Sequence, residues 1–439
     1  MMKPFAPFPG PRSRFSRRTA LKAGTAAALA ATGGSALATF GARAARRAQG
    51  QPISFWSRDD GQVLFDPIAA AWNESHPNQI EPTYIPSEQF VQKFAAAVAG
   101  GEPPDLVAVD LIYMPAFAEA GQMTDLTDQA RALPFFDTLS PPHMRLGTYE
   151  DRIYSLPFNA DGSFLLFNKN LFTAAGLDPK APPTTWAAIT EASQAITEAG
   201  GGTARGFYFS GSCPGCNAFT LLPYIWASGG DVLNEDGTAA TLDDPNVKAM
   251  LEFVGGLWQN GQVPESAQVD TGEDFFNAFT SGTVGMLGTG AFSIAELKRD
   301  FPDLDFGVTP LPGREGGQSS FAGGDTVAIP TGSTRVEEAF EFLTWYLSDE
   351  IQVEQLAKNN GLPLRTDLIE NRYSAEDPRY VTVGKAMYDG RTPYTVKYNQ
   401  LFNDSASPWL EMLQRAIFDG EVDDAIAQAQ ASFTEIIAS

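Results

Sequence analysis

The sequence predicts an α/β protein built on a largely parallel sheet and preceded by a basic export segment. Short apolar runs typical of buried strands alternate with longer stretches whose apolar residues recur at helical spacing. The first 48 residues contain nine lysines and arginines and no acidic residue, whereas the rest of the chain is strongly acidic. A β-α-β-α-β series of this kind implies parallel strands joined by right-handed crossovers.

The composition is that of a globular protein. The chain has 439 residues, 43% hydrophobic and 19% charged, which is enough for two domains with well-filled cores. No apolar run reaches the ~20 residues that a membrane-spanning helix needs, so a soluble mature chain is expected.

After residue 48 the chain holds 21 basic and 53 acidic residues. This charge repels phosphate backbones and anionic lipid, so nucleic acid and membrane surfaces are not expected partners. It suits a neutral or cationic ligand, or is a solvated coat with no bearing on the ligand.

Residues 1–48 are interpreted as an export signal, to be left out of fold reasoning. The run Ser16-Arg17-Arg18-Thr19-Ala20-Leu21-Lys22 resembles the twin-arginine motif, and the weakly apolar stretch 23–38 follows it. Ala20 departs from that motif, and an ordinary secretory signal is the alternative. No cysteine lies nearby to carry a lipid anchor. The expected location is the periplasm or the outer face of the cell membrane.

The only two cysteines, Cys213 and Cys216, flank a Pro-Gly pair. In a cytosolic protein this spacing suggests redox chemistry or half of a zinc site. A second cysteine pair is absent, and the two histidines, His76 and His143, have no ligand-like spacing. Given export, we expect a small structural disulfide, with a thioredoxin-like role as the alternative. No metal or cofactor is expected.

The elements fall into two series. In the first, predicted strands cover 53–56, 83–85 and 106–109, with helices at 65–72, 90–98 and 115–120. The second begins near residue 160, with predicted strands at 164–167, 206–210, 284–287, 306–309 and 327–329 and helices at 185–198, 219–227, 245–260 and 275–281. From residue 335 the chain is mainly helical. No internal repeat is evident, and the second series predicts a second domain.

Parallel sheets bind ligands beyond the carboxyl ends of their strands. The polar residues that follow the first three strands are therefore candidates: Trp56, Arg58, Asp59, Glu88 and Asp110. For the charged members the alternative is a helix N-cap or a solvated loop charge.

Five stretches match the motifs of one family in that family's order. They are Gly100-Gly101-Glu102-Pro103-Pro104-Asp105; the run from Ile153-Tyr154-Ser155-Leu156-Pro157 through Leu166-Phe167-Asn168-Lys169-Asn170-Leu171-Phe172 to Pro183-Thr184-Thr185-Trp186; Trp226-Ala227-Ser228-Gly229-Gly230; Gly285-Met286-Leu287 to Phe292; and residues 321–329. On these motifs the chain resembles the extracellular solute-binding proteins of carbohydrate ABC importers, the maltose-binding-protein-like family. Asn170 stands where that family usually has Asp.

The resemblance implies an α/β fold of the two-lobed type II periplasmic-binding kind, with discontinuous lobes joined by hinge crossovers. The implied N-lobe covers 51–158 and 285–328, and the implied C-lobe covers 161–284 and 331–439. The implied function is a monomeric, non-catalytic subunit that captures a sugar or oligosaccharide between its lobes and delivers it to a membrane permease.

A sugar presents hydroxyl edges and apolar faces, so its site needs carboxylates, amides, arginines and aromatic rings. With the resemblance, the full set of ligand-binding candidates is Trp56, Arg58, Glu88, Asp110, Asp161, Asn217, Phe219, Trp226, Thr289, Gly290, Phe292, Gly323, Gly324, Asp325 and Arg365. For Asn217 and Phe219 the alternatives are a helix cap and a core ring. For Trp226 the alternative is burial under the Gly229-Gly230 turn.

Two other functions stay open. A secreted glycosidase would use a carboxylate pair such as Asp110 and Asp161, but the sequence has no Gly-x-Ser-x-Gly and no His-Glu-x-x-His motif. A binding protein of the same fold for a non-sugar solute, such as a glycerol phosphodiester or a polyamine, is the other alternative.

Overall fold

The computed structural model describes residues 51–439. The predicted export signal, residues 1–48, lies outside the described residues. Within residues 51–439, none of the helices has both the length and the apolar character needed to cross a membrane. Gly50–Ser439 forms one compact unit.

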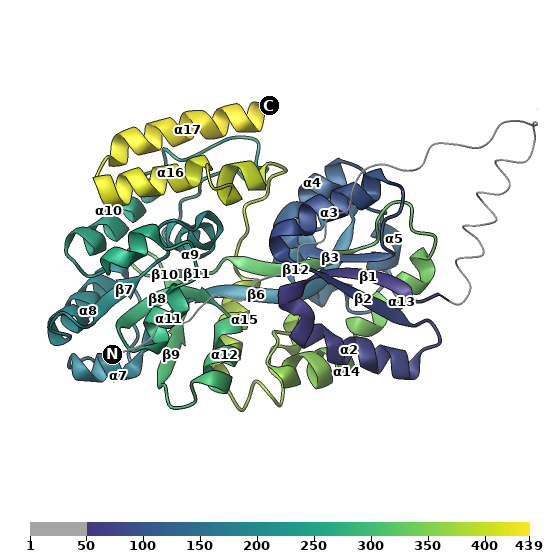
Figure 1. Cartoon of the computed structure of the whole chain (residues 1–439), viewed down its shortest axis with the longest axis horizontal. Helices are drawn as coiled ribbons and strands as arrows, with labels where there is room; N and C mark the ends of the chain where they lie inside the picture. Colours follow the sequence, from purple (N-terminus) through teal and green to yellow (C-terminus); the bar gives the residue numbers. More distant parts are fainter. Residues whose placement is uncertain (1–50) are drawn as a thin grey trace, which may run out of the picture. The chain divides into compact units, whose positions relative to one another are not determined.

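An eight-stranded mixed sheet forms the centre of this unit (Figure 1). Its order is β2-β1-β3-β12-β6-β8-β7, and β9 also pairs with β6. The strands are β1 Ile53–Arg58, β2 Ile80–Ile85, β3 Leu106–Asp110, β6 Ser155–Asn168, β7 Arg205–Tyr208, β8 Val284–Gly290, β9 Phe306–Thr309 and β12 Ala322–Ala328. Two small hairpin-like pairs join β4 Thr148–Tyr149 to β5 Arg152–Ile153 and β10 Leu311–Pro312 to β11 Gln318–Ser319.

Helices cover this sheet. They are α2 Gln62–Ser75, α3 Ser87–Ala99, α4 Met114–Glu119, α5 Thr127–Arg131, α6 Pro141–Leu146, α7 Lys169–Ala174, α8 Trp186–Ala199, α9 Pro214–Ala227, α10 Pro245–Gln259, α11 Phe275–Thr280, α12 Phe292–Asp300, α13 Val336–Tyr346, α14 Asp349–Ile351, α15 Pro378–Tyr388, α16 Pro408–Gln414 and α17 Val422–Ala438. Shorter helical turns include η1 Asp59–Gly61, η2 Leu111–Tyr113 and η8 Asn399–Asn403. The predicted strands and the main predicted helices are confirmed.

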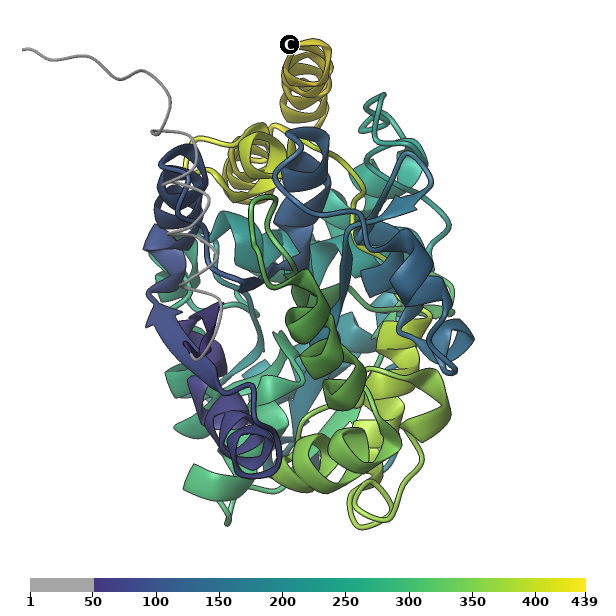
Figure 2. The same cartoon turned by 90° about the vertical axis from the view of Figure 1, so that its right-hand side faces the viewer.

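The first series folds as predicted, with β1 parallel to both β2 and β3. Helix α2 buries Phe65, Ile68 and Trp72, which share one face at helical spacing. The Phe65 ring centroid lies 4.5 Å from that of Phe55 on β1 and 6.1 Å from that of Phe342 on α13. Figure 2 shows α13, in green, in front of this part of the sheet. The aromatic cluster therefore ties α13 to the first series.

Strand β6 is long enough to belong to two groups of strands. Residues 155–162 pair with β12, whereas 163–168 pair with β8 and β9. We call the part with β1, β2, β3, β12 and α13 the N-lobe, and the part with β7, β8 and β9 the C-lobe. This pairing corrects the predicted boundaries. Strands β8 and β9, which the prediction placed in the N-lobe from residue 285 on, are hydrogen-bonded into the C-lobe part of the sheet, and 336–346 pack on the N-lobe core, because β8 pairs with β7 and α13 packs on β1.

Candidate functional site

A cavity of about 980 Å³ lies at the junction of the two lobes. Both lobes contribute to its walls, and β6 crosses beneath it with Asn159, Ala160 and Asp161 among the lining residues. Nine predicted site residues line it: Arg58, Asp110, Asp161, Phe219, Thr289, Gly290, Phe292, Gly323 and Gly324. The topology explains this gathering, since the carboxyl ends of β1 and β3 meet the ends of β8 and β12 there.

The N-lobe wall is a charged network centred on Arg58. Its guanidinium Nη2 lies 2.6 Å from Asp325 Oδ1, and Nη1 lies 3.3 Å from Asp60 Oδ2 and 3.6 Å from Asp110 Oδ2. Arg58 and Asp110 end two parallel strands, and Asp325 on β12 is the direct cross-strand partner of Asp110. Asp110 Oδ1 also accepts a hydrogen bond from the backbone N–H of Ile112. One cation therefore holds three carboxylates.

The pKa values of Asp325, Asp110 and Arg58 are shifted by burial and by the charges of one another. Burial raises the pKa of Asp325 to about 6, although Arg58 opposes the shift, and burial also raises the pKa of Asp110. Burial alone would lower the pKa of Arg58, but the three carboxylates outweigh it and raise that pKa. The wall therefore carries surplus negative charge and a guanidinium that is already fully engaged.

Asp161 stands on β6 where the strand passes from one lobe to the other. Its Oδ1 accepts hydrogen bonds from the backbone N–H groups of Gly162 (3.0 Å) and Ala291 (2.6 Å). Burial raises its pKa to about 7, while these backbone hydrogen bonds oppose the shift. At Gly290 a Cβ would lie 2.3 Å from Asp161 Oδ2, so only glycine leaves this carboxylate in place.

The C-lobe wall is mainly aromatic. Phe209, Phe219, Phe275, Phe292 and Phe321 line the cavity. The Phe219 and Phe321 ring centroids are 5.3 Å apart, and Phe292 is 51% exposed at the first turn of α12. Aromatic faces suit the apolar faces of a ligand, so the two walls offer complementary chemistry.

Residues 56–353 match the family of bacterial extracellular solute-binding proteins. The chain belongs to this family. The match spans both lobes and the cavity, and it confirms the resemblance seen in the sequence motifs.

Relatives of this solute-binding protein bind several solutes. The chain is 24% identical over 354 residues to the diacetylchitobiose-binding protein of Streptomyces coelicolor, covering 79% of this chain and 80% of that protein. It is 24% identical over 337 residues to the sn-glycerol-3-phosphate-binding periplasmic protein of Escherichia coli, covering 71% and 74%. The crystal structure of the cyclic α-maltosyl-1,6-maltose-binding protein of Arthrobacter globiformis superposes with a TM-score of 0.77 at 24% identity, covering 88% of this chain and 99% of that one. The predicted two-lobed type II fold is thus confirmed.

Six predicted site residues of the solute-binding protein lie outside the cavity lining. Asp325 sits behind Arg58, with its side chain 1% exposed. Trp56 is half-buried against a hydrophobic cluster, and Glu88 is exposed at the start of α3. Because Asp325 is buried and pairs with Arg58, it positions Arg58 and does not face the cavity.

The other three have structural partners. Asn217 Nδ2 donates to the Ser210 carbonyl oxygen, and Trp226 Nε1 donates to Asp231 Oδ1. The buried Arg365 guanidinium pairs with Asp349 and Asp367. The family's loop motif predicted Arg365 as a ligand contact, but the structure pairs it with these two carboxylates and places it outside the cavity lining.

Sequence reasoning missed part of the lining. Tyr398, the N-cap residue of η8, is 3% exposed, and the cavity is also lined by Asn403, Tyr208, Ser210, Asn159 and Asp60. Tyr398 and Asn403 come from a segment to which only general helical character was assigned. The cluster of Tyr and Asn between residues 394 and 403 was the available signal.

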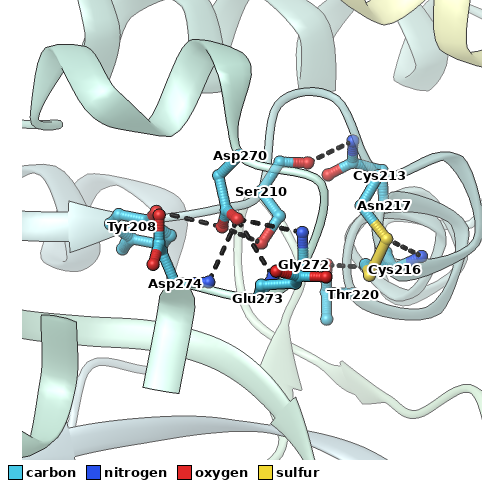
Figure 3. Close-up of a disulfide and its surroundings, with 10 residues drawn as sticks. All are labelled: Tyr208, Ser210, Cys213, Cys216, Asn217, Thr220, Asp270, Gly272, Glu273 and Asp274. Atoms are coloured by element: carbon cyan, nitrogen blue, oxygen red, sulfur yellow. Dashed lines mark hydrogen bonds between the residues drawn. A yellow bond between two sulfur atoms is a disulfide. The ribbon is translucent and has the colours of Figure 1, made fainter. Parts of the chain in front are cut away.

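The predicted disulfide joins Cys213 to Cys216 (Figure 3). Cys213 is the N-cap residue of α9, and its Sγ accepts a hydrogen bond from the backbone N–H of Cys216. Cys216 and Gly215 line the cavity. Among residues 51–439, no group of three or more histidine, cysteine, aspartate or glutamate side chains is placed to hold a metal.

Proposed function

We propose that this protein is the substrate-binding subunit of an ABC importer, which captures one sugar or oligosaccharide between its lobes and delivers it to a membrane permease. The observation that carries the proposal is the pairing of a carboxylate wall with an aromatic wall across one cavity. Carboxylates accept hydrogen bonds from hydroxyl edges, and aromatic rings cover the sugar's apolar faces. Several relatives and structural neighbours are sugar-binding proteins, which supports the proposal.

The proposed mechanism is closure of the two lobes around the ligand. The ligand contacts both lobes, so it binds the closed arrangement more tightly and shifts the population toward it. The closed form is then recognised by the permease. Strand β6 lines the cavity at Asn159–Asp161, close to the point where its partner strands change, which supports this mechanism.

We propose binding without catalysis. The carboxylates that a glycosidase would use are engaged by protein groups: Asp161 accepts hydrogen bonds from two backbone N–H groups, and Asp110 accepts one from Ile112 and forms an ion pair with Arg58. Recovery of unaltered oligosaccharide after prolonged incubation with the purified protein would agree with this, whereas release of shorter sugars would contradict it.

A phosphorylated solute is the second candidate, because glycerol-3-phosphate-binding proteins are among the relatives. The charge of the cavity disfavours it. Of the described residues that line the cavity, Arg58 and Arg299 are the cations, and Arg58 is engaged by three carboxylates while Arg299 pairs with Asp300. A phosphate would therefore meet surplus negative charge, and of these two cations only Arg299, in an exposed pair with its neighbour, could turn toward it.

We further propose export of a monomer through the twin-arginine route, directed by residues 1–48. The extracellular character of the family supports export. A fusion of these residues to a reporter, with Arg17 and Arg18 replaced by Lys, tests the route: loss of export supports it, and unchanged export assigns an ordinary secretory signal.

Thermal-shift screening of monosaccharides, oligosaccharides and glycerol 3-phosphate tests the central proposal. A ligand at 100 times its dissociation constant adds about 2.7 kcal/mol to the free energy of unfolding. Stabilisation by a neutral sugar, and none by glycerol 3-phosphate, is the expected result. Stabilisation by the phosphate alone would replace the sugar proposal with the second candidate.

A further inference from the structure

The Cys213–Cys216 disulfide lies in the wall of the cavity rather than in a remote part of the fold. The two half-buried cysteines begin α9, and the next turn of that helix presents Phe219 and Thr220 to the cavity. Thr220 Oγ1 donates to the Cys216 carbonyl oxygen at 2.8 Å. The disulfide is therefore linked by a hydrogen bond to one lining residue, Thr220, and lies one helical turn before another, Phe219.

A tightly bonded loop lies beside the disulfide (Figure 3). Asp270 is 4% exposed, and its Oδ1 accepts hydrogen bonds from the backbone N–H groups of Gly272, Glu273 and Asp274. Its Oδ2 accepts from Tyr208 Oη at 3.0 Å and Ser210 Oγ at 2.7 Å. We call residues 270–274 the Asp270 loop. The next residue, Phe275, lines the cavity.

Gly272 joins the loop to the disulfide. Its φ is +104°, and a Cβ at this position would lie 2.9 Å from Cys216 Sγ and 3.2 Å from Cys213 Sγ. The backbone of the Asp270 loop thus packs against both sulfur atoms. A side chain is excluded there by the sulfurs and by the backbone conformation.

The Pro-Gly turn inside the disulfide also packs on a contact between the lobes. A Cβ on Gly215 would lie 2.7 Å from Asn403 Oδ1. Asn403 Nδ2 donates to the hydroxyl of Tyr113 at 3.2 Å. Tyr113 ends η2, directly after N-lobe strand β3, whereas Gly215 begins α9 of the C-lobe. The disulfide turn therefore supports a hydrogen bond that links the Tyr113 side of the cleft to Asn403.

We infer that the Cys213–Cys216 disulfide is a positioning element of the cavity, and that its reduction loosens the Asp270 loop and weakens ligand capture. The capture half of this statement rests on the proposed function. A bond that closes a loop this short restricts the unfolded chain little, so a role in global stability alone is the weaker explanation. The bond acts locally, through Gly272 on one side and Asn403 on the other.

The reduction is ordinary thiol–disulfide exchange. A thiolate of an added dithiol attacks one sulfur, the S–S bond breaks, and a mixed disulfide forms. The second thiol of the reagent then displaces the protein sulfur, which leaves two protein thiols and a cyclic oxidised reagent. The two protein sulfurs no longer share a bond and must separate to non-bonded contact, which pushes against Gly272.

Hydrogen exchange on the full mature chain, without ligand, tests the positioning role. We expect dithiothreitol to speed amide exchange in peptides covering 270–276 by tenfold or more, with no change in α13. The Cys213→Ser/Cys216→Ser double variant should behave like the reduced protein, and reoxidation of the wild type should reverse the effect. Unchanged exchange in 270–276, or an equal increase throughout the chain, would overturn the inference.

Calorimetric titration with maltotriose and N,N′-diacetylchitobiose tests capture. For any probe that binds the oxidised protein, we expect at least fivefold weaker binding after reduction. Equal affinity would overturn the capture half of the inference. If neither probe binds the oxidised protein, the proposed function loses support, and the hydrogen-exchange result still decides the positioning role.

A glycine pair supplies a matched control without any redox reagent. Gly272→Ala places a methyl group against both sulfurs, whereas Gly316→Ala has nearly the same positive φ, +108° against +104°, with no atom within 4 Å. Both changes carry backbone strain, but only Gly272→Ala should speed exchange in 270–276. Equal effects of the two variants in that segment would show that strain alone, and not contact with the disulfide, is responsible.

Discussion

The two walls of the cavity are built in opposite ways. The N-lobe wall depends on the Arg58 guanidinium, 18% exposed, which holds the buried Asp325 as well as Asp110 and Asp60, so the guanidinium and its buried partner are costly to remove. The C-lobe wall depends on rings such as Phe292, which is half exposed before any ligand arrives. The charged wall is therefore expected to carry stability as well as recognition, whereas the aromatic wall keeps part of its contact area for the ligand.

The largest effect should follow from Arg58→Met. Removal of the guanidinium leaves Asp325 buried without its partner, and we expect a loss of about 3–5 kcal/mol in the free energy of unfolding at neutral pH. The loss should shrink near pH 5, since burial raises the pKa of Asp325 to about 6 and the carboxyl is then largely neutral. Urea denaturation at both pH values measures this. Arg299→Met, in an exposed pair with Asp300, is the control and should change stability little.

Asp161→Asn should alter the pH dependence of stability. The pKa of Asp161 is raised to about 7 in the folded protein from a usual value near 4, so the folded state holds the proton more tightly than the unfolded chain does. This contribution is fully present below about pH 4, is lost as pH rises to 7, and amounts to about 4 kcal/mol at most. Denaturation of both proteins between pH 4 and 8 measures the difference. Parallel curves would contradict the expected titration.

The same proton should affect binding. Because the ionised carboxylate is the better acceptor for a sugar hydroxyl, affinity of the wild type should fall as pH drops below 7. The Asn variant should bind more weakly and show less of this pH dependence. Titration of the screened sugar at pH 5.5 and 8 compares the two.

A smaller effect is expected on the aromatic wall. Phe292→Ala removes a ring that already meets solvent, so stability should change little while sugar affinity falls about tenfold, or ~1.4 kcal/mol. Phe301→Ala, at the other end of α12 and outside the cavity lining, is the matched control. A loss of stability at Phe292 comparable to that of Arg58→Met would remove the contrast between the walls.

The smallest effect should come from Asp60→Asn. Its side chain is 55% exposed at the rim of the network, and exposed ion pairs contribute little, so we expect less than about 1 kcal/mol in the free energy of unfolding. Chemical denaturation of Asp60→Asn and Arg58→Met side by side compares the stability contributed by the rim of the charged wall with that contributed by its buried part. A loss of several kcal/mol would show that the rim is as critical as the centre.

Local patterns predicted most of the fold. The periodicity of residues 90–98 and the stop at Gly100-Gly101 correspond to α3, and the short apolar runs correspond to strands. Lobe membership was harder, because it depends on which strands pair. The pattern of β8 and β9 fits either lobe, the resemblance implied the N-lobe from residue 285 on, and only the hydrogen bonds of these strands to β6 and β7 assign them to the C-lobe.

Site residues could be predicted where the sheet topology fixes the edge of the sheet at which a strand ends. Arg58 and Asp110 follow parallel strands, so both were expected at one edge of the sheet, and both line the cavity. Arg365 was not predictable in this way, since its partners Asp349, at the start of α14, and Asp367, in a short helical turn at 366–368, lie in elements too short for the pattern to specify. Tyr398 was missed because a buried tyrosine in an irregular segment gives no periodic signal.

Strand β6 has one more consequence. Its single continuous backbone pairs with an N-lobe strand along one part and with C-lobe strands along the other, so a rotation of one lobe against the other would twist it where its partners change, around Asn159–Ser163. Three of these residues also line the cavity. A ligand in the cavity would therefore contact the same β6 residues whose backbone torsion sets the angle between the lobes.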